Sequence, residues 1–205
     1  MIHFLYADQL NDYPELRDSM FRDRATQFKE RMGWDVSVDE NGFEQDQYDV
    51  LCPLYVIAAD ENGRHMGSMR LLPTTGRTMV NEHFTNVIGG GTVVSPFIWE
   101  CTRFCLGTGG KPATAALLML AGGQVLKGLD ITSFVGVFDA PMLRIYSAIG
   151  SSPDILGTQD DISVGLWNFT DDAQAKIARR ARTTPEQVTT WFERDFQQNG
   201  MAQSA

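Results

Sequence analysis

The chain has 205 residues, of which 43% are hydrophobic, and its 17 basic and 26 acidic side chains leave a formal net charge of −9. That length fits a single domain, residues 1–205, with its own hydrophobic core. The acidic balance, with no basic run among aromatics, argues against nucleic-acid binding. No apolar run approaches the roughly 18 residues of a membrane helix, and the N-terminus lacks the features of a signal peptide. We therefore expect a cytoplasmic protein with no membrane or nucleic-acid partner.

Cysteine and histidine spacing indicates neither a disulfide framework nor a metal site. Cys52, Cys101 and Cys105 form no CxxC pair and are odd in number, so we expect free thiols. The three histidines are scattered along the chain and show no ligand spacing. No metal or other cofactor is expected.

The first part of the chain predicts a helix followed by a long loop. Apolar residues recur at three- and four-residue steps from Pro14 to Met32, as in an amphipathic helix, and Arg24 lies on or beside the apolar stripe. Residues 33–50 are polar and interrupted by glycines, which predicts a loop. Loops of this length are uncommon in compact domains unless they serve a function, such as closing over a ligand.

The rest of the chain predicts alternating strands and helices. Strands are expected over residues 54–59, 65–72, 97–106, 131–138 and 162–169, and near Ile155. Asn62-Gly63 should form the turn between the first two. Helices are expected over residues 112–126, 141–148 and from Pro185 onward, with a frayed tail after Gln197. This order predicts an α/β fold with a mixed central β-sheet flanked by helices.

Charged side chains occur inside apolar, strand-like stretches, where an ion is tolerated only when paired or hydrogen-bonded. Asp46 and Asp49 are natural partners for nearby arginines, because bidentate Arg–carboxylate pairs can hold a loop against a sheet. Taken from the residues alone, these two aspartates fit solvated loop charges as well. The three arginines and three acids considered are charge-balanced, which predicts a buried polar site. They are Arg24, Arg70 and Arg103 with Asp46, Asp49 and Glu100.

Glu100 lies between Trp99 and Cys101, where loss of water should raise the pKa of its carboxyl, a property of general bases. A buried structural ion pair with Arg103 is the alternative interpretation. Strict strand alternation places Glu100 and Thr102 on one face and Arg103 on the other. Either a bulge turns these side chains, or Arg103 pairs with a different acid.

Phe28, Trp34 and Phe84 allow two interpretations. Aromatic side chains most often pack in cores. They also form walls around an adenine ring or a sulfonium, because cations bind to aromatic faces. Trp34, next to Gly33 at the end of the expected helix, is the favoured ligand contact.

Over about residues 4–150 the chain resembles the LuxI-type acyl-homoserine-lactone synthases in residue type, order and spacing. The matching residues are Arg24, Phe28, Trp34, Asp46, Asp49, Arg70, Phe84, Glu100 and Arg103. The resemblance implies a GNAT-like N-acyltransferase fold. It implies S-adenosylmethionine as one substrate, an acyl thioester usually carried by acyl carrier protein as the other, and a quorum-sensing signal as product. The amino-donor site would lie before about residue 110, and the acyl-chain half in residues 111–205.

The resemblance also implies roles for individual residues. Glu100, with Arg103 beside it, would take a proton from the ammonium of S-adenosylmethionine. The amine would attack the thioester, and the methionine carboxylate would then displace methylthioadenosine and close the lactone, a step that needs mostly positioning. The acid and arginine cluster with Trp34 and Thr102 would bind the amino donor. A backbone donor in the central strands would hold the thioester oxyanion.

Apolar residues in the second half suit an acyl tunnel, although each suits an ordinary core as well. They are Leu118, Phe134, Met142, Leu143, Ile145 and Tyr146. Gly136 falls where synthases for 3-oxo chains resemble one another in carrying Thr. The missing hydroxyl favours an unsubstituted or otherwise different acyl chain.

The acyl carrier is harder to infer from sequence. Acyl carrier protein is acidic and needs a basic docking patch, whereas this chain is net acidic, so acyl-CoA is an alternative donor. A local basic patch could be formed by Arg17, Arg22, Lys111, Lys127 and Arg144.

Two other functions compete with the synthase. A CoA-dependent N-acetyltransferase of similar fold would bind pyrophosphate with a Gln/Arg-x-x-Gly-x-Gly/Ala loop at a helix start. Here the first glycine after Arg103, Gly107, comes one residue late. A non-catalytic sensor would bind the lactone or S-adenosylmethionine and would usually carry a DNA-binding or oligomerising module, which is not evident near Trp191.

Overall fold

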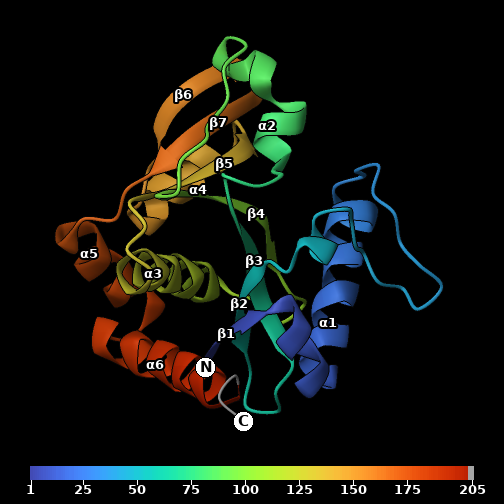
Figure 1. Ribbon diagram of the computed structural model, residues 1–205, viewed down its shortest axis with the longest axis vertical. Coiled ribbons are helices and arrows are strands. Elements are labelled where there is room, and N and C mark those ends of the chain that lie inside the picture. The colour runs from blue at the N-terminus through green and yellow to red at the C-terminus, as the bar shows by residue number, and fades with distance from the viewer. Residues whose placement is uncertain (203–205) are drawn as a thin grey trace.

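A seven-stranded sheet runs through the molecule and carries helices on both faces (Figure 1). The computed structural model describes residues 1–202. The strand order is β1-β2-β3-β4-β5-β7-β6, and only the β4–β5 pair is parallel. The expected α/β fold with a mixed sheet is confirmed. The strands are β1 Ile2–Tyr6, β2 Leu54–Ala59, β3 His65–Pro73, β4 Ile98–Leu106, β5 Ser133–Asp139, β6 Asp154–Gln159 and β7 Ile162–Trp167.

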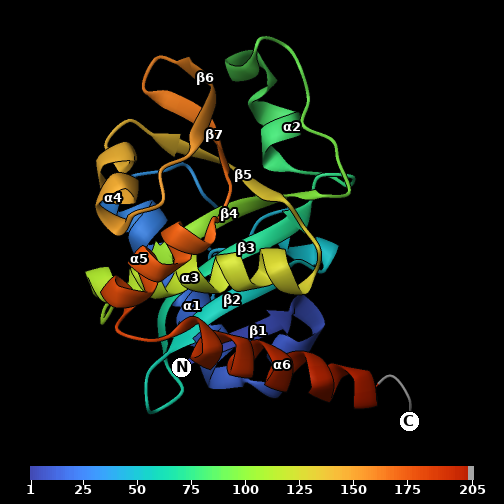
Figure 2. The same cartoon turned by 90° about the vertical axis from the view of Figure 1, so that its left-hand side faces the viewer.

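The helices differ widely in length. The helix α2, Met79–His83, has five residues and lies near β5 and β7 (Figure 2). The others are α1 Pro14–Ala25, α3 Pro112–Gly128, α4 Met142–Ile149, α5 Asp171–Ala181 and α6 Pro185–Ala202.

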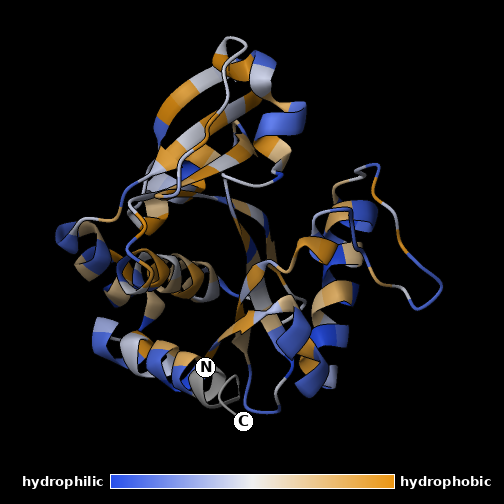
Figure 3. Ribbon diagram, viewed as in Figure 1, coloured by the Kyte–Doolittle hydropathy of each residue, from blue (hydrophilic) through white to orange (hydrophobic). Residues whose placement is uncertain are grey.

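Strand alternation explains how the two faces of the sheet are covered. In β2, Leu54 and Val56 point into the main core, which includes α3 and α6, whereas Tyr55 and Ile57 point into the core beneath α1. All six residues of β2 are buried, as expected for a strand covered on both faces. Figure 1 shows α1 on one side of the sheet and α3 and α6 on the other. In Figure 3 hydrophobic residues predominate along the strands.

Most expected elements lie within two residues of their predicted bounds, and the differences are local. The first helix is regular only to Ala25 and continues as a wider π-helical turn over Thr26–Arg31. The last helix continues past Gln197 to Ala202. The end of that expected tail, residues 203–205, lies outside the described residues.

The strand β1 and the helix α5 were not predicted. At the sheet edge, β1 is completed by side chains of α6, because Asp195 Oδ2 accepts from the Phe4 N–H at 2.8 Å and Arg194 Nη2 donates to the Ile2 carbonyl at 2.9 Å. These bonds satisfy backbone groups that an uncovered edge would leave free.

The strands β4 and β5 separate in the middle of the sheet. Their pairing is confined to Ile98–Glu100 with Ser133–Val135, although β4 continues to Leu106 and β5 to Asp139. Glu100 is therefore the last residue of β4 that pairs with β5. Beyond it, the side of β4 that faces β5 has no ladder partner within residues 1–202.

Candidate active site

Three cross-strand neighbours form a polar row on the face of the sheet that α1 covers. Arg70 of β3 stands opposite Tyr55 of β2 and Thr102 of β4. Residues directly opposite each other in neighbouring strands point to the same face, so all three side chains project toward α1. Arg70 Nε donates to Thr102 Oγ1 at 3.0 Å. The sheet thus presents a guanidinium group that is fully buried.

A bulge in β4 turns Arg103 onto this same face. The register between β3 and β4 shifts, so that both Arg103 and Phe104 stand opposite Met69. Arg103 has φ +52°, the left-handed conformation of the first residue in a G1-type bulge. Both alternatives raised by strand alternation are therefore confirmed. The strand is bulged, and Arg103 pairs with acids other than Glu100.

Three arginines and three acids close a ring of alternating ion pairs. The shortest N···O contacts between neighbours in the ring are 2.5 to 3.0 Å. Arg24 binds Asp49 through both terminal nitrogens, and Arg70 binds Asp46 in the same way. In order around the ring, the members are Glu44, Arg24, Asp49, Arg70, Asp46 and Arg103, which returns to Glu44.

Glu44 is the member of the ring that was not predicted from the sequence. The third acid was expected to be Glu100, whereas the structure places Glu44 between Arg24 and Arg103 with no exposed surface. A signal was present, since Glu44 lies two residues before Asp46 and both side chains of an i, i+2 pair in extended backbone share a face. In a polar loop, where most charged side chains face solvent, this spacing is only weak evidence that Glu44 is buried.

The ring ties the loop over residues 32–53 to α1, β3 and β4. Burial alone would raise the pKa of the Asp49 carboxyl, but Arg24 and Arg70 outweigh burial and hold that pKa well below its usual range. Tyr55 also donates its hydroxyl to Asp49 Oδ1 at 2.5 Å. Because three positive and three negative charges alternate, the ring is formally neutral, and each desolvated ion has two opposite neighbours.

The Glu100 carboxylate is fully buried and is held by the backbone of α2, not by Arg103. Its oxygens accept hydrogen bonds from the Val80 N–H at 2.6 Å and the Met79 N–H at 3.1 Å. The hydroxyl of Thr78, the residue before the helix, is buried without a hydrogen-bond partner. Glu100 thus supplies the acceptors that a capping side chain usually provides. The alternative interpretation, an ion pair between Glu100 and Arg103, is wrong.

The same burial changes the acidity of Glu100. Loss of water raises the pKa of its carboxyl, and the two α2 amides and the Arg70 charge oppose that rise without cancelling it. A raised carboxyl pKa is the property expected of a general base that works near neutral pH.

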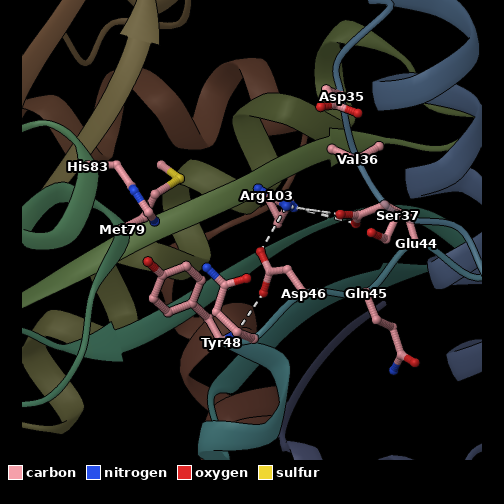
Figure 4. Close-up of a pocket in the computed structure, with 11 residues that line it drawn as sticks. Asp35, Val36, Ser37, Glu44, Gln45, Asp46, Tyr48, Met79, His83 and Arg103 are labelled. Carbon is pink, nitrogen blue, oxygen red and sulfur yellow. Dashed lines mark hydrogen bonds and ion pairs between the residues drawn. The ribbon is translucent and has the colours of Figure 1, made fainter.

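A cavity of about 460 Å³ lies between the ring and α2 (Figure 4). Asp46 and Arg103 line one wall, while Met79 and His83 of α2 line another. Since the backbone N–H of Met79 also bonds Glu100, the buried carboxylate lies behind this second wall. The other lining residues are Asp35, Val36, Ser37, Glu44, Gln45, Gln47 and Tyr48.

Two of the three expected aromatics lie together beside the ring. Phe28 and Trp34 stack with centroids 5.1 Å apart and planes 2° from parallel, and the Arg103 guanidinium lies 5.4 Å from the Phe28 centroid. Phe28 is buried, whereas Trp34 is 46% exposed. Phe84 packs instead against a small cluster that includes Val135. The structure therefore does not bring Phe84 to a common wall with the other two.

Residues 8–163 match the family model described as autoinducer synthase, which is more than half of the chain. The chain belongs to the autoinducer synthase family. An acyl-homoserine-lactone synthase of Rhizobium etli is 35% identical over 98% of this chain and 100% of its own length. Another from Agrobacterium fabrum is 33% identical over 72% of this chain and 67% of its own.

Solved structures agree with this family assignment at the level of the fold. The acyl-homoserine-lactone synthase LasI matches with a TM-score of 0.76 at 26% identity, over 86% of this chain and 93% of its own. An acyl-CoA N-acyltransferase from Pseudomonas aeruginosa matches with a TM-score of 0.55 at 13% identity, over 82% of this chain and 99% of its own. The expected likeness to N-acyltransferases is thereby confirmed for the fold.

The residues expected to line an acyl tunnel divide into two groups. Leu118, Phe134 and Tyr146 are buried in the main core, and Met142 is partly buried against it. Leu143 and Ile145, in contrast, are 36% and 46% exposed. Their assignment to a buried tunnel is wrong, because α4 turns them away from the side of the helix that packs on the core.

Gly136 lies in close contact with its neighbours in this synthase fold. An added Cβ would lie 3.1 Å from Trp167 Cζ3 and 3.2 Å from the Cys101 carbonyl oxygen. The Trp167 indole is held by a hydrogen bond to the Ser151 carbonyl at 3.2 Å and by an edge contact with Tyr146 at 5.0 Å between centroids. A threonine at position 136 would therefore need these neighbours to move.

The five basic residues proposed as a patch do not gather in one place. Lys111 precedes α3 and Lys127 lies near its end, so roughly 24 Å of helix separates them. Arg17 and Arg22 lie on α1, on the opposite side of the sheet (Figure 1), and each contacts Asp18. A single patch made of all five residues is therefore not formed.

The described residues contain no group of three or more His, Cys, Asp or Glu side chains placed to hold a metal ion. Over the same part of the chain, no helix has the length and apolar character needed to cross a bilayer. The three cysteines are free, as expected.

Replacing Glu44 with Gln tests the ring. We expect a loss of about 3 kcal/mol in the free energy of unfolding, because the buried Arg24 guanidinium and the largely buried Arg103 guanidinium lose a shared negative partner. Urea unfolding measures this loss. Glu40→Gln, at an exposed position in the same loop, is the matched control and should change stability by less than about 0.5 kcal/mol. Equal effects of the two substitutions would contradict the ring's role.

Proposed function

We propose that this protein is an acyl-homoserine-lactone synthase that acylates S-adenosylmethionine and then closes the lactone, releasing methylthioadenosine. The observation that carries the proposal is the accessible edge of the neutral ring. Asp46 and Arg103 keep 14% and 11% of their side-chain surface exposed and line the cavity together. An acid and a guanidinium side by side complement the ammonium and the carboxylate of an amino-acid substrate.

Glu100 is the proposed base for the first step. It takes a proton from the substrate ammonium, and the freed amine attacks the thioester carbonyl, so that an amide forms and the carrier thiol leaves. Glu100 lies behind Met79, so the proton reaches it past the first turn of α2. The raised pKa of its carboxyl makes Glu100 a better proton acceptor than an ordinary carboxylate.

Lactone closure needs mainly positioning. The methionine carboxylate attacks the γ-carbon of its own side chain, and the bond from that carbon to sulfur breaks with both electrons leaving on methylthioadenosine. Arg103 holds the carboxylate, and the partly exposed Trp34 stacked on Phe28 offers an aromatic face to the sulfonium.

We propose that the acyl thioester binds where β4 and β5 separate. Backbone N–H groups of β4 beyond Glu100 are proposed to bind the developing oxyanion, because they lack a ladder partner on the β5 side. The acyl chain then runs among Leu118, Phe134, Met142 and Tyr146. With the space beside Gly136 filled by Trp167, we propose an acyl chain without a 3-oxo group.

For the donor, we propose acyl carrier protein, as the family resemblance implies. Acyl-CoA is the second candidate, favoured by the dispersal of the basic side chains. The solved structure of MesI is described as a CoA-dependent acyl-homoserine lactone synthase and matches with a TM-score of 0.79 over 90% of this chain and 96% of its own. Its 24% identity to this chain supports a common fold. We propose no cofactor besides the two substrates, and a cytoplasmic location.

An assay of the purified protein with S-adenosylmethionine tests this function. The same acyl groups are supplied on acyl carrier protein and on CoA, in unsubstituted and 3-oxo forms, and products are identified by mass. We expect equimolar methylthioadenosine and an unsubstituted acyl-homoserine lactone. Mainly 3-oxo products would reject the proposed acyl preference. Consumption of acetyl-CoA without methylthioadenosine would favour an N-acetyltransferase, and ligand binding without any product would favour a sensor.

Replacing Glu100 with Gln tests the proposed base. The amide oxygen can still accept one α2 hydrogen bond, so we expect S-adenosylmethionine to bind, whereas turnover should fall by at least about 100-fold because no base remains. Calorimetry measures binding, and release of methylthioadenosine measures turnover. Glu61→Gln, in the exposed hairpin turn, is the control. Turnover that survives in Glu100→Gln would show that another group takes the proton.

A further inference from the structure

Tyr48 connects the two walls of the cavity between the ion-pair ring and α2. Its backbone N–H donates to Asp46 Oδ1 at 2.8 Å, and its hydroxyl donates to Glu82 Oε2 of α2 at 2.8 Å. Asp46 belongs to the ion-pair ring, whereas α2 carries the amides that hold Glu100. One residue therefore contacts both the wall that would bind the amino donor and the helix that holds the proposed base.

The environment of the Tyr48 side chain fixes its position. Tyr48 is 2% exposed. The Arg70 guanidinium lies 5.5 Å and the Arg77 guanidinium 5.8 Å from the centroid of its aromatic ring. Arg77 also binds Glu82, with Nε 2.6 Å from Oε1, so the acceptor of the tyrosine hydroxyl is itself held. Burial and the nearby Glu82 raise the pKa of Tyr48, which keeps its hydroxyl protonated as a donor.

The helix α2 is short, and contacts outside it set its place. Thr78 does not cap it, and Asn81 exchanges two hydrogen bonds with the backbone of Val93, each 2.8 Å long. These bonds join α2 to the segment before β4. The Tyr48–Glu82 bond joins α2 to the loop that carries the ring acids, across the cavity.

We propose that Tyr48 is a positioning residue for Glu100. By tying α2 to the loop of the ion-pair ring, it keeps the Met79 and Val80 amides on the Glu100 carboxylate and holds the cavity walls at a fixed separation. This inference rests on the proposed function of Glu100 as the base. Tyr48 itself need not touch the reacting atoms.

The consequence is a change in the acidity of Glu100 when the bond is lost. Hydrogen bonds to a carboxylate favour its charged form, so weaker amide contacts leave the ionised state less stable. The charged and titratable groups that face Glu100 are Arg70 of β3, Asp46 and Tyr48 of the loop, and Cys101 of β4. None of these is altered in charge by Tyr48→Phe at neutral pH. The pKa of Glu100 should therefore rise in that variant.

The test compares Tyr48→Phe with Tyr55→Phe. Both substitutions remove one buried tyrosine hydroxyl that is bound to a carboxylate, but Tyr55 binds Asp49 in the ring and has no bond to α2. The midpoint for Glu100 is measured by carboxyl ¹³C NMR, with the signal assigned by its absence in Glu100→Gln. We expect a higher midpoint in Tyr48→Phe and an unchanged midpoint in Tyr55→Phe. Glu82→Ala removes the same bond from the other side and should raise the midpoint as well.

A kinetic readout complements the titration. The acid limb of kcat/KM for S-adenosylmethionine should move to higher pH in Tyr48→Phe, and at a pH below the limb the rate should fall about tenfold for every pH unit that the limb moves. An unchanged Glu100 midpoint in Tyr48→Phe, or equal changes in both tyrosine variants, would overturn the inference. Absence of methylthioadenosine release by the wild-type protein would instead contradict the proposed function, while the NMR titration would still decide the role of Tyr48.

Discussion

A closed ring of alternating charges organises this molecule. Each of its three guanidinium groups contacts two carboxylates, and each carboxylate contacts two guanidinium groups. Buried ions are costly to desolvate, and a single buried pair repays that cost only with good geometry. Closing the ring gives every ion two opposite neighbours and leaves no net charge. Without it, the loop over residues 32–53 would be held mainly by a few apolar contacts, such as those of Phe43 with the core beneath α1 and of Trp34 with Phe28.

Two irregularities in β4 place the ring and the proposed base next to each other. The bulge at Arg103 turns that side chain onto the face that carries Arg70 and Thr102. Three residues earlier, Glu100 ends the pairing with β5 and contacts α2. Arg103 of the cavity wall and the proposed base thus come from one strand, yet they have separate partners. In the proposed mechanism Arg103 holds the substrate carboxylate, while burial keeps the pKa of Glu100 raised.

The sequence predicts much of this arrangement, and the parts it misses have physical reasons. Charged residues inside apolar strands indicated a buried polar site, and Arg24, Arg70 and Arg103 all belong to it. Glu44 was missed because a glutamate in a polar loop has no local feature that marks it as buried. The partners of Glu100 were missed because they are backbone N–H groups. Nearly every residue carries such a group, so the sequence does not mark the ones that bind Glu100. For Leu143 and Ile145, hydrophobic character alone did not reveal which side of α4 faces solvent.

The ring holds the acid-bearing loop rigidly on the sheet, and hydrogen exchange of the unmodified protein measures this rigidity directly. The backbone N–H groups of Glu44, Asp46 and Tyr48 bond to Phe21, Asp49 and Asp46 respectively, at 3.2, 2.8 and 2.8 Å. If the ring holds, these amides should exchange as slowly as those of the buried strand β2, although they lie outside the sheet and the α-helices. Exchange at the rate of an unstructured peptide would show that the ring does not hold the loop.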